Sequence, residues 1–404
     1  MMTKQEPNSF LPYGRQLVED DDIEAVTRVL RSDFLTTGPE VEKFENRFAE
    51  ITGAEHAVAC ANGTAALHLC LLALGPQTSK TVVVPSVTFL ATANAVRLAG
   101  GNVVFADVDA NTGLMSPAHL EAAIERSSHP VTAAFVVHLG GQTADLDELS
   151  TVADKHGIPL LEDSCHALGT SFRTNAGTHR VGDCRFSTAS SFSLHPVKTI
   201  AAGEGGVVTT NDSALAQHIR LLRSHGMTRD QGDFQNGTLA FASDGASNAW
   251  YYEMPEVGLN YRLSDIQAAL ARSQLAKLDR FAQQRRKITS RYDQALEKLA
   301  HVIKPVPRSN YCDPVLHIYQ VLIDFEQLSI DRNTLMTKLR NDGIGTQVHY
   351  IPVHLQPYYA NQGSRLELPG ADRFYARTLS LPLFASMCPA DVDRVADALE
   401  RHLR

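Results

Sequence analysis

The feature that most constrains this chain is the alternation of short apolar runs with helical patterns between residues 64 and 223. The apolar runs are Val82–Val84, Val103–Val108, Ala133–Val137, Pro159–Leu161, Ala189–Phe192 and Val207–Thr209. The helical patterns lie near Thr64–Leu74, Leu90–Ala99, Pro117–Ile124, Asp147–His156 and Ser213–Arg223. Strands joined by helical connections pair in parallel, so this rhythm predicts an α/β domain around a mostly parallel sheet.

After about Tyr252 the pattern changes to a mixture typical of an α+β unit. Ser264-x-x-Gln267 is a capping box that predicts the start of a long helix running past Phe281. The elements expected further on are strands at Leu316–Ile323 and Thr346–Tyr350 and helices near Arg332–Asp342 and from Pro389. We therefore predict a large domain over residues 11–254 and a smaller C-terminal domain over residues 255–404.

Charge and cysteine usage exclude some classes of protein. The chain of 404 residues has a formal net charge of −8, with 37 basic and 45 acidic side chains, which argues against a nucleic-acid partner. No stretch reaches the ~18 consecutive apolar residues of a membrane span, and the sequence MMTKQEPNSF lacks the apolar core of a signal peptide. The six cysteines form no C-x-x-C pair, so we expect reduced thiols, no metal site and a cytoplasmic location.

Two candidate catalytic residues follow predicted strands. Asp163 ends the apolar run of LLEDSCHA, at the edge where open α/β sheets bind ligands, and a buried acid there can keep a pyridinium nitrogen protonated. Lys198 follows a predicted strand in SLHPVK, 35 positions later, before the glycine cluster GEGG. A lysine held in a partly dry place can form an imine and move protons. Taken singly, Asp163 is equally compatible with a helix N-cap and Lys198 with a solvated surface lysine.

Two further segments suit a phosphate and a flat ring. The turn Ala61-Asn62-Gly63-Thr64-Ala65 opens a helix whose free N–H groups can hold a phosphate. Phe89, after the run at Val82–Val84, can stack on an aromatic cofactor. An ordinary capped helix and a core phenylalanine are the alternatives that these segments leave open.

In combination, the segments HPVKTIAAGEGGVVTTND, LLEDSCHALGT and GLNYRLSDIQAAL resemble the DegT/StrS family of sugar-nucleotide aminotransferases. The resemblance runs in order from about Leu11 to the last helix. It implies a type I pyridoxal-phosphate (PLP) transferase fold, aspartate aminotransferase-like, with PLP as the cofactor. It also implies that Lys198 binds PLP covalently and moves the proton at the substrate carbon, that Asp163 pairs with the pyridine nitrogen, and that His166 lies beside the ring or its 3′-oxygen.

The resemblance also assigns the remaining contacts to the cofactor. Gly63, Thr64 and Ala65 would hold the phosphate, Ser193 would add a hydroxyl, and Phe89 would stack on the ring. Asn260 would reach the phosphate in the partner subunit of a homodimer. The chain departs from the common pattern at Asn62, where many relatives have serine, and at Leu194, where many have phenylalanine; both changes affect the expectation of substrate fit.

Three segments narrow the resemblance to one branch: LPYGRQLVEDDDIEAVTRVLRSDFLTTGP, RLLRSHGMTRD and VHYIPVHLQPYY. They are similar to the 4-aminotransferases of pseudaminic acid biosynthesis. That branch implies transfer of an amino group from L-glutamate to C4 of a UDP-linked 4-keto-6-deoxy-N-acetyl-hexose, which gives UDP-4-amino-4,6-dideoxy-N-acetyl-β-L-altrosamine. Arg229, His317 and His349 are candidates to bind the diphosphate; a surface salt bridge or a core histidine is the alternative for each.

Three alternatives remain open. The acceptor could be a dTDP- or GDP-linked 4-keto sugar. The chain could be a PLP-dependent sugar dehydratase, although those relatives have histidine where this chain has Lys198. It could also be a non-catalytic regulatory protein of the same fold, against which the presence of Asp163, His166 and Lys198 argues.

Overall fold

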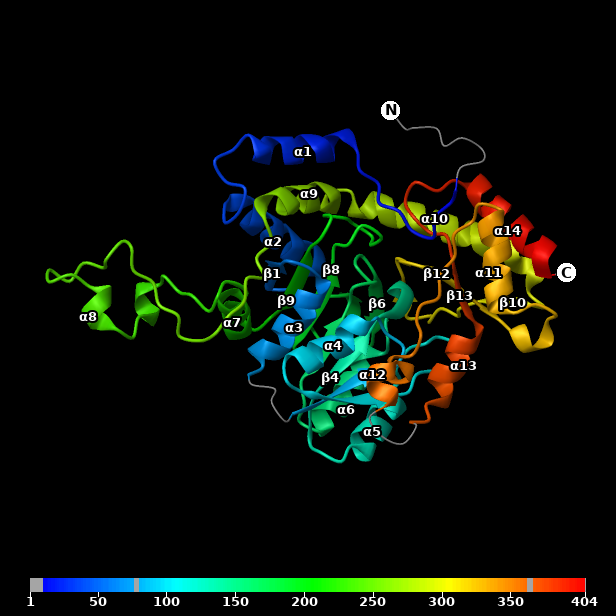
Figure 1. The fold of residues 1–404 in the computed structure, drawn as a ribbon, viewed down its shortest axis with the longest axis horizontal. Helices are drawn as coiled ribbons and strands as arrows, with labels where there is room; N and C mark the ends of the chain where they lie inside the picture. The colour runs from blue at the N-terminus through cyan, green and yellow to red at the C-terminus, as the bar shows by residue number, and fades with distance from the viewer. Residues whose placement is uncertain (1–9, 76–79, 362–365, 404) are drawn as a thin grey trace.

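The computed structural model describes residues 10–75, 80–361 and 366–403. At its centre is a seven-stranded sheet in the order β1-β9-β8-β5-β4-β2-β3, with helices around it (Figure 1). The strands are β1 His56–Cys60, β2 Thr81–Pro85, β3 Asn102–Ala106, β4 Val131–Val137, β5 Leu160–Asp163, β8 Ala189–Ser193 and β9 Gly206–Thr210. The pairs from β3 through β2, β4 and β5 to β8 are parallel, whereas β9 is antiparallel to β8 and to β1. The predicted mostly parallel sheet is confirmed, and β1 is a strand that the pattern missed.

Helices cover both faces of this sheet, as the strand sequences require. Val82 and Val84 of β2 belong to a core with helices α3, α4 and α7, whereas Val83 belongs to a core with α2, α5 and α6. The helices are α2 Pro39–Thr52, α3 Gly63–Ala73, α4 Leu90–Leu98, α5 Pro117–Arg126, α6 Leu146–Lys155 and α7 Ser213–Arg223. Since neighbouring side chains of a strand point to opposite faces, a continuous apolar run is stable only in a sheet that is covered on both.

The C-terminal part forms a separate core. Helices α10 (Leu278–Leu296), α11 (Arg332–Asn341) and α14 (Pro389–Leu403) pack on a three-stranded sheet of β10, β12 and β13. These strands are Ile303–Pro305, Tyr319–Ile323 and Thr378–Leu381. The short helices α12 (Pro357–Ala360) and α13 (Pro369–Arg377) precede β13. The α+β character is as expected, and the exact division at residue 254 stays a prediction.

The long helix expected after Ser264 is two helices. The capping box is present, because Ser264 Oγ accepts the Gln267 N–H at 3.3 Å and Gln267 Oε1 accepts the Ser264 N–H at 3.2 Å. However, α9 (Asp265–Leu275) ends before α10 begins at Leu278. At the break, Lys277 forms ion pairs with Asp21 and Asp22 of α1 (Asp20–Leu30) at 2.7 and 2.6 Å. The break lets α9 lie beside α1 while α10 continues toward the C-terminal core (Figure 1).

The strand predicted at Thr346–Tyr350 is wrong. Only Gln347 makes a β-bridge, to Ser380 of β13. His349 and Tyr350 instead direct their side chains to Ser380 Oγ and to His166 Nε2, at 2.8 and 3.1 Å. In a regular strand these two neighbouring side chains would point to opposite faces of the sheet. Here both of them make polar contacts within the protein.

A hairpin that the pattern missed lies between β5 and β8. Strands β6 (Ser171–Thr174) and β7 (Gly177–Arg180) pair in antiparallel fashion, and β11 (Cys312–Asp313) adds to their edge. The pairing of β11 with β6 brings a C-terminal segment beside the loop that follows Asp163.

An arm over residues 228–253 projects from the body beyond α7 and carries α8 (Gly237–Ala240) (Figure 1). A bridge between Thr228 and Glu253 closes its base. Inside it, Phe234 packs edge-on against Tyr251 with ring centroids 4.9 Å apart, while Trp250 is 68% exposed. The arm thus has its own small aromatic cluster and leaves an indole ring on the surface.

The N-terminal segment over residues 10–17 lies across both halves of the molecule. The N–H of Leu11 donates to Gly343 O at 2.8 Å, and the N–H of Leu383 donates to Tyr13 O at 3.0 Å. A side chain on Gly14 would meet Val197, the neighbour of Lys198, at 3.4 Å. Within the described ranges, no helix is long and apolar enough to cross a membrane; the cytoplasmic location stays a prediction.

Candidate active site

The predicted site residues gather at one edge of the central sheet. Strands β1 and β8 run in the same direction, because each is antiparallel to β9, and β8 is parallel to β5. Their carboxyl ends therefore open on the same edge as those of β2, β4 and β5, which is the ligand-binding edge of open α/β sheets. The residues that follow these ends are Gly63–Ala65 after β1, Phe89 after β2, His166 after β5 and Lys198 after β8, with Asp163 and Ser193 as the last residues of β5 and β8.

Asp163 is a buried carboxylate with a fixed orientation. Its side chain accepts a hydrogen bond from Thr92 Oγ1 at 2.7 Å on one oxygen and from the N–H of Cys165 at 3.2 Å on the other. The residue is only 5% exposed, and the N–H of His138 holds its carbonyl oxygen at 3.1 Å. The carboxylate is therefore held in one orientation at the sheet edge.

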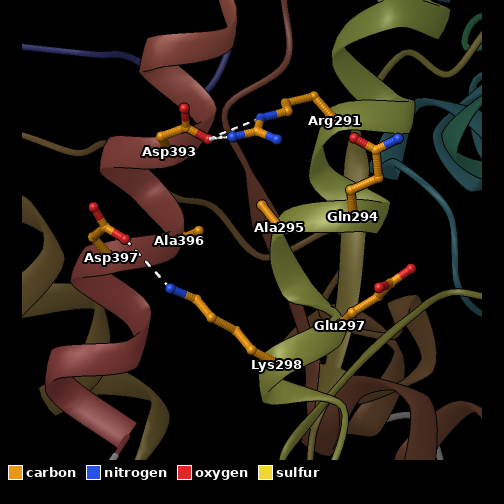
Figure 2. Close-up of a pocket in the computed structure, with 8 residues that line it drawn as sticks. All are labelled: Arg291, Gln294, Ala295, Glu297, Lys298, Asp393, Ala396 and Asp397. Carbon is orange, nitrogen blue, oxygen red and sulfur yellow. Dashed lines mark hydrogen bonds and ion pairs between the residues drawn. The ribbon is translucent and has the colours of Figure 1, made fainter.

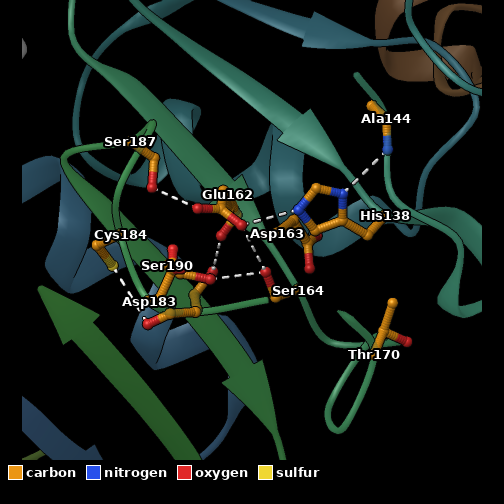
Figure 3. A network of polar contacts seen from close by, with 12 residues as sticks. His138, Ala144, Glu162, Asp163, Ser164, Thr170, Asp183, Cys184, Ser187 and Ser190 are labelled. Carbon is orange, nitrogen blue, oxygen red and sulfur yellow. Dashed lines mark hydrogen bonds and ion pairs between the residues drawn. The ribbon is translucent and has the colours of Figure 1, made fainter. Parts of the chain in front are cut away.

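Glu162, the preceding residue, anchors the same strand from its other face. Figure 3 shows its carboxylate beside His138, Ser187 and Ser164. His138 Nε2 lies 2.8 Å from Glu162 Oε2, and Ser187 Oγ donates to Oε1. Because His138 Nδ1 accepts the N–H of Ala144 at 3.3 Å, Nε2 carries the proton and donates to Glu162. This network ties the end of β4 to the end of β5 just beneath Asp163.

Lys198 lies in a tight turn, in which its N–H donates to His195 O at 2.8 Å. The side chain is half-buried. Burial lowers the pKa of Lys198, although the negative charges that Cys165 and Asp163 can carry oppose this shift. A lower pKa increases the neutral fraction of the amine, which is the form that attacks a carbonyl and accepts a proton.

His166 is buried beside Lys198 in a defined tautomer. Its Nδ1 accepts the N–H of Gly140 at 3.2 Å, so Nε2 carries the proton and donates to Tyr350 Oη at 3.1 Å. Burial and the charge of Lys198 hold the pKa of His166 well below its usual range. Gly141, the residue after Gly140, has no room for a side chain, because a Cβ there would lie 2.4 Å from Val315 O.

His317 and His349 also lie in this cluster, but not as cations. The His317 and His166 rings have centroids 4.5 Å apart, and Nδ1 of His317 is buried with no hydrogen-bond partner among the described residues. Burial and Lys198 lower the pKa of His317 well below normal and that of His349 to about 3. Both rings are therefore neutral near pH 7 in this structure, and their expected role as partners of a diphosphate stays a prediction.

The start of α3 forms a narrow cradle that fits a phosphate. Asn62 Oδ1 caps the helix by accepting the N–H of Ala65 at 2.8 Å. Within the described part of the chain, the N–H groups of Gly63 and Thr64 have no acceptor, as expected for a helix N-terminus that binds an anion. A Cβ on Gly63 would lie only 2.7 Å from Ser193 Cβ, so the two segments converge at this point.

Two aromatic rings line the same edge. Phe89 is 54% exposed, and its ring centroid is 5.8 Å from that of Tyr350. An exposed ring at the edge that also carries Lys198 could stack on a flat cofactor. Sequence reasoning missed Tyr350 and Thr92, although Tyr350 belongs to the segment VHYIPVH that carries part of the resemblance.

Arg229 and Asn260 make no contact with this cluster among the described residues. Both are exposed. Arg229 is at the base of the arm, and Asn260 forms a β-bridge with Ser224 just after α7. No contact joins either of them to the other candidates in the residue ranges that the structure describes, so their roles stay predictions.

A surface groove of about 530 Å³ lies elsewhere, between α10 and α14 (Figure 2). Ion pairs cross it, from Arg291 to Asp393 at 2.5 Å and from Lys298 to Asp397 at 3.4 Å. None of the predicted site residues lines it. Four of its five charged side chains pair with one another in this way.

Known proteins resemble this chain over almost its whole length. A model described as the DegT/DnrJ/EryC1/StrS aminotransferase family matches residues 16–400. The chain is 39% identical over 399 residues to the spore coat polysaccharide biosynthesis protein SpsC of Bacillus subtilis (strain 168), covering 98% of this chain and 97% of that protein.

Solved structures of high similarity include Helicobacter pylori PseC, an aminotransferase involved in the biosynthesis of pseudoaminic acid. It superposes with a TM-score of 0.87 at 28% identity, covering 98% of this chain and 99% of that one. The PLP form of the putative sugar aminotransferase Spr1654 from Streptococcus pneumoniae gives a TM-score of 0.85 at 25% identity, over 97% and 98% of the two chains. DesI, solved in the presence of its TDP-sugar product, gives 0.82 at 30% identity, over 98% and 93%.

Proposed function

Because this chain belongs to the DegT/DnrJ/EryC1/StrS aminotransferase family, we propose that it aminates C4 of a UDP-linked 4-keto-6-deoxy-N-acetyl-hexose, with L-glutamate as donor. The chain is a PLP-dependent sugar aminotransferase with the type I fold. The similarity to PseC over nearly the whole of both chains supports a precursor of pseudaminic acid as the product. The observation that carries the proposal is the convergence of Lys198, Asp163 and the α3 cradle at one sheet edge.

Each group at this edge has a role in the proposal. When bound, PLP supplies an electron sink for the carbon that gains or loses the amino group. Lys198 Nζ anchors the cofactor and moves the proton at the sugar C4, a step worth about 10²–10⁴-fold. Asp163 would keep the ring nitrogen protonated, and His166 would lie beside the ring or its 3′-oxygen.

The remaining contacts hold the cofactor in place. The free N–H groups of Gly63 and Thr64 would bind the phosphate at the start of α3, where the helix dipole favours negative charge, with Ala65 beside them. Ser193 would add its hydroxyl, and the exposed ring of Phe89 would stack on the pyridine ring.

The spectrum of the purified protein tests the first half of this proposal. We expect a visible absorption band with PLP that L-glutamate bleaches, because conjugation between Lys198 and the cofactor is lost when the amine is transferred. Lys198→Ala should lose both properties, whereas Lys43→Ala, which removes an exposed lysine paired with Glu40, should keep them. A protein without the band, or an unchanged response in Lys198→Ala, would favour the non-catalytic alternative.

The acceptor is then identified by adding UDP-, dTDP- and GDP-linked 4-keto sugars to the glutamate-treated enzyme. Return of the visible band with the UDP sugar alone supports our proposal. DesI, a relative solved with a TDP-sugar product, makes the dTDP sugar the second candidate. A band that returns only with that sugar would replace the UDP-linked acceptor.

We further propose that the active form is a homodimer in which Asn260 binds the phosphate in the partner's site. The exposure of Asn260, which among the described residues contacts none of the other candidates, supports a role across an interface. Mixing Lys198→Ala and Asn260→Ala subunits tests this, because a mixed dimer then holds one fully intact site only if Asn260 acts in trans. Recovery of activity is the expected result; no recovery in dimers shown to exchange subunits would place Asn260 in its own site or in neither.

A further inference from the structure

The orientation of Asp163 depends on a hydroxyl chain that begins in a different segment. Thr92 Oγ1 lies 2.7 Å from Asp163 Oδ2, 2.8 Å from Thr88 Oγ1 and 3.3 Å from Phe89 O. Thr92 has one proton, and the carboxylate at the shortest distance can only accept it. Thr88 must therefore donate to Thr92, so the hydrogen bonds run from Thr88 to Thr92 to Asp163.

These two hydroxyl groups are shielded from water. Thr92 is 0% exposed and Thr88 is 1% exposed. In such surroundings a hydrogen bond to a charged group is stronger than at the surface, and successive bonds polarise one another. A buried hydroxyl pair therefore holds the carboxylate firmly at one oxygen, while its other oxygen accepts the more distant N–H of Cys165 at 3.2 Å.

The same short segment also carries Phe89, the last residue before α4, while Thr92 lies in the first turn of that helix. One rigid unit therefore holds the ring that faces the cofactor plane and the group that fixes the acid at its nitrogen. Movement of this segment would displace both contacts together.

We propose that Thr92, supported by Thr88, is a positioning residue that sets the alignment of Asp163 with the pyridine nitrogen of the cofactor. The proposal rests on the proposed role of Asp163. Thr92 touches neither cofactor nor substrate in it and acts only through the carboxylate.

The test is a double-mutant cycle on the full-length protein. In Thr92→Val, which keeps the shape and removes the proton, we expect PLP to bind about 10-fold more weakly, consistent with loss of one hydrogen bond to a charged group. The pH midpoint of the visible band should move in the same direction as in Asp163→Ala, by a smaller amount. Thr92→Ser should restore both quantities.

In the Asp163→Ala background, Thr92→Val should change neither quantity further, because the group through which it acts is gone. Additive effects in the double mutant, or an unchanged pH midpoint in Thr92→Val, would overturn the proposal. Thr52→Val is the matched control: Thr52 is 2% exposed and donates to Phe48 O at 2.9 Å in α2, so its loss should leave both quantities as in wild type.

The two proposals fail in different ways. If wild type itself shows no visible band with PLP, the proposed function fails. If wild type has the band and Asp163→Ala changes it while Thr92→Val behaves as wild type, only the role of Thr92 is refuted.

Discussion

Replacing Gly63 by alanine should weaken the binding of PLP with little effect on folding. The added Cβ would lie 2.7 Å from Ser193 Cβ and 3.1 Å from Ser193 Oγ. Carbon atoms in contact are about 3.5–4.0 Å apart, so the start of α3 must move by about 1 Å. That movement displaces the N–H groups of Gly63 and Thr64 from the positions that face the phosphate.

The expected sizes follow from opposing effects. Overpacking costs about 1–3 kcal/mol, whereas alanine in a helix is about 0.5–1 kcal/mol more favourable than glycine. The free energy of unfolding of the apo protein should therefore fall by only ~0–2 kcal/mol. Loss of one hydrogen bond to a charged phosphate, worth about 1.5–3 kcal/mol, should raise the dissociation constant of PLP by about 10–100-fold.

The assay is a PLP titration of the apo protein, followed by absorbance, with chemical denaturation of the same samples. Gly237→Ala is the control, because Gly237 is also the first residue of a helix after a capping asparagine, and a Cβ there meets nothing within 4 Å. Adding Ser193→Gly to Gly63→Ala removes the clashing atom and should recover part of the affinity. A folded Gly63→Ala protein with the wild-type dissociation constant would refute the cradle.

Further predictions concern acid stability, a buried ion pair and the stacking ring. Burial and Lys198 lower the pKa of His349 to about 3, below its value of ~6.5 in the unfolded chain. The contribution of the neutral ring to the free energy of unfolding is therefore complete above pH ~6.5. It is lost as the pH falls toward 3, at up to about 1.4 kcal/mol per pH unit. In urea denaturation at pH 7 and 5, His349→Gln should therefore lose less stability than wild type. Arg223→Met should cost about 3–5 kcal/mol, since it leaves buried Glu45, 2.5 Å away in wild type, without its partner; Glu45→Gln should cost less, and equal losses would contradict this reading. Phe89→Leu should weaken PLP binding by about 3–10-fold if an aromatic contact worth about 0.5–1.5 kcal/mol is lost, and an unchanged titration curve would argue against stacking.

The sequence predicts what depends on local periodicity. The runs around Val83 and Leu161 identify strands of the central sheet, and the capping box at Ser264 marks the start of α9. Helix α2 is not among the predicted elements, although Phe44 and Phe48 lie one helical turn apart and pack in the same core. The strand β1 is five residues long and joins the sheet only by pairing with β9, more than a hundred positions later.

The site is predictable only in part for the same reason. Asp163 and Lys198 follow strands, so their position at the sheet edge is implied by topology. Thr92 and Tyr350 act on partners 71 and 184 positions away in the chain. No local pattern specifies such pairs, because they depend on how the helices and loops pack. The neutral state of His317 likewise comes from burial, which residue type alone does not reveal.

The path of the N-terminal segment has a consequence for biosynthesis. Leu11 and Tyr13 take their partners from Gly343 and Leu383, and Gly14 lies against Val197 beside the lysine. During synthesis, the segment over residues 10–17 therefore cannot form these contacts until Gly343 and Leu383 have emerged from the ribosome. Contacts of such sequence separation slow folding, so the segment over residues 10–17 should be among the last parts of the described chain to reach its final position.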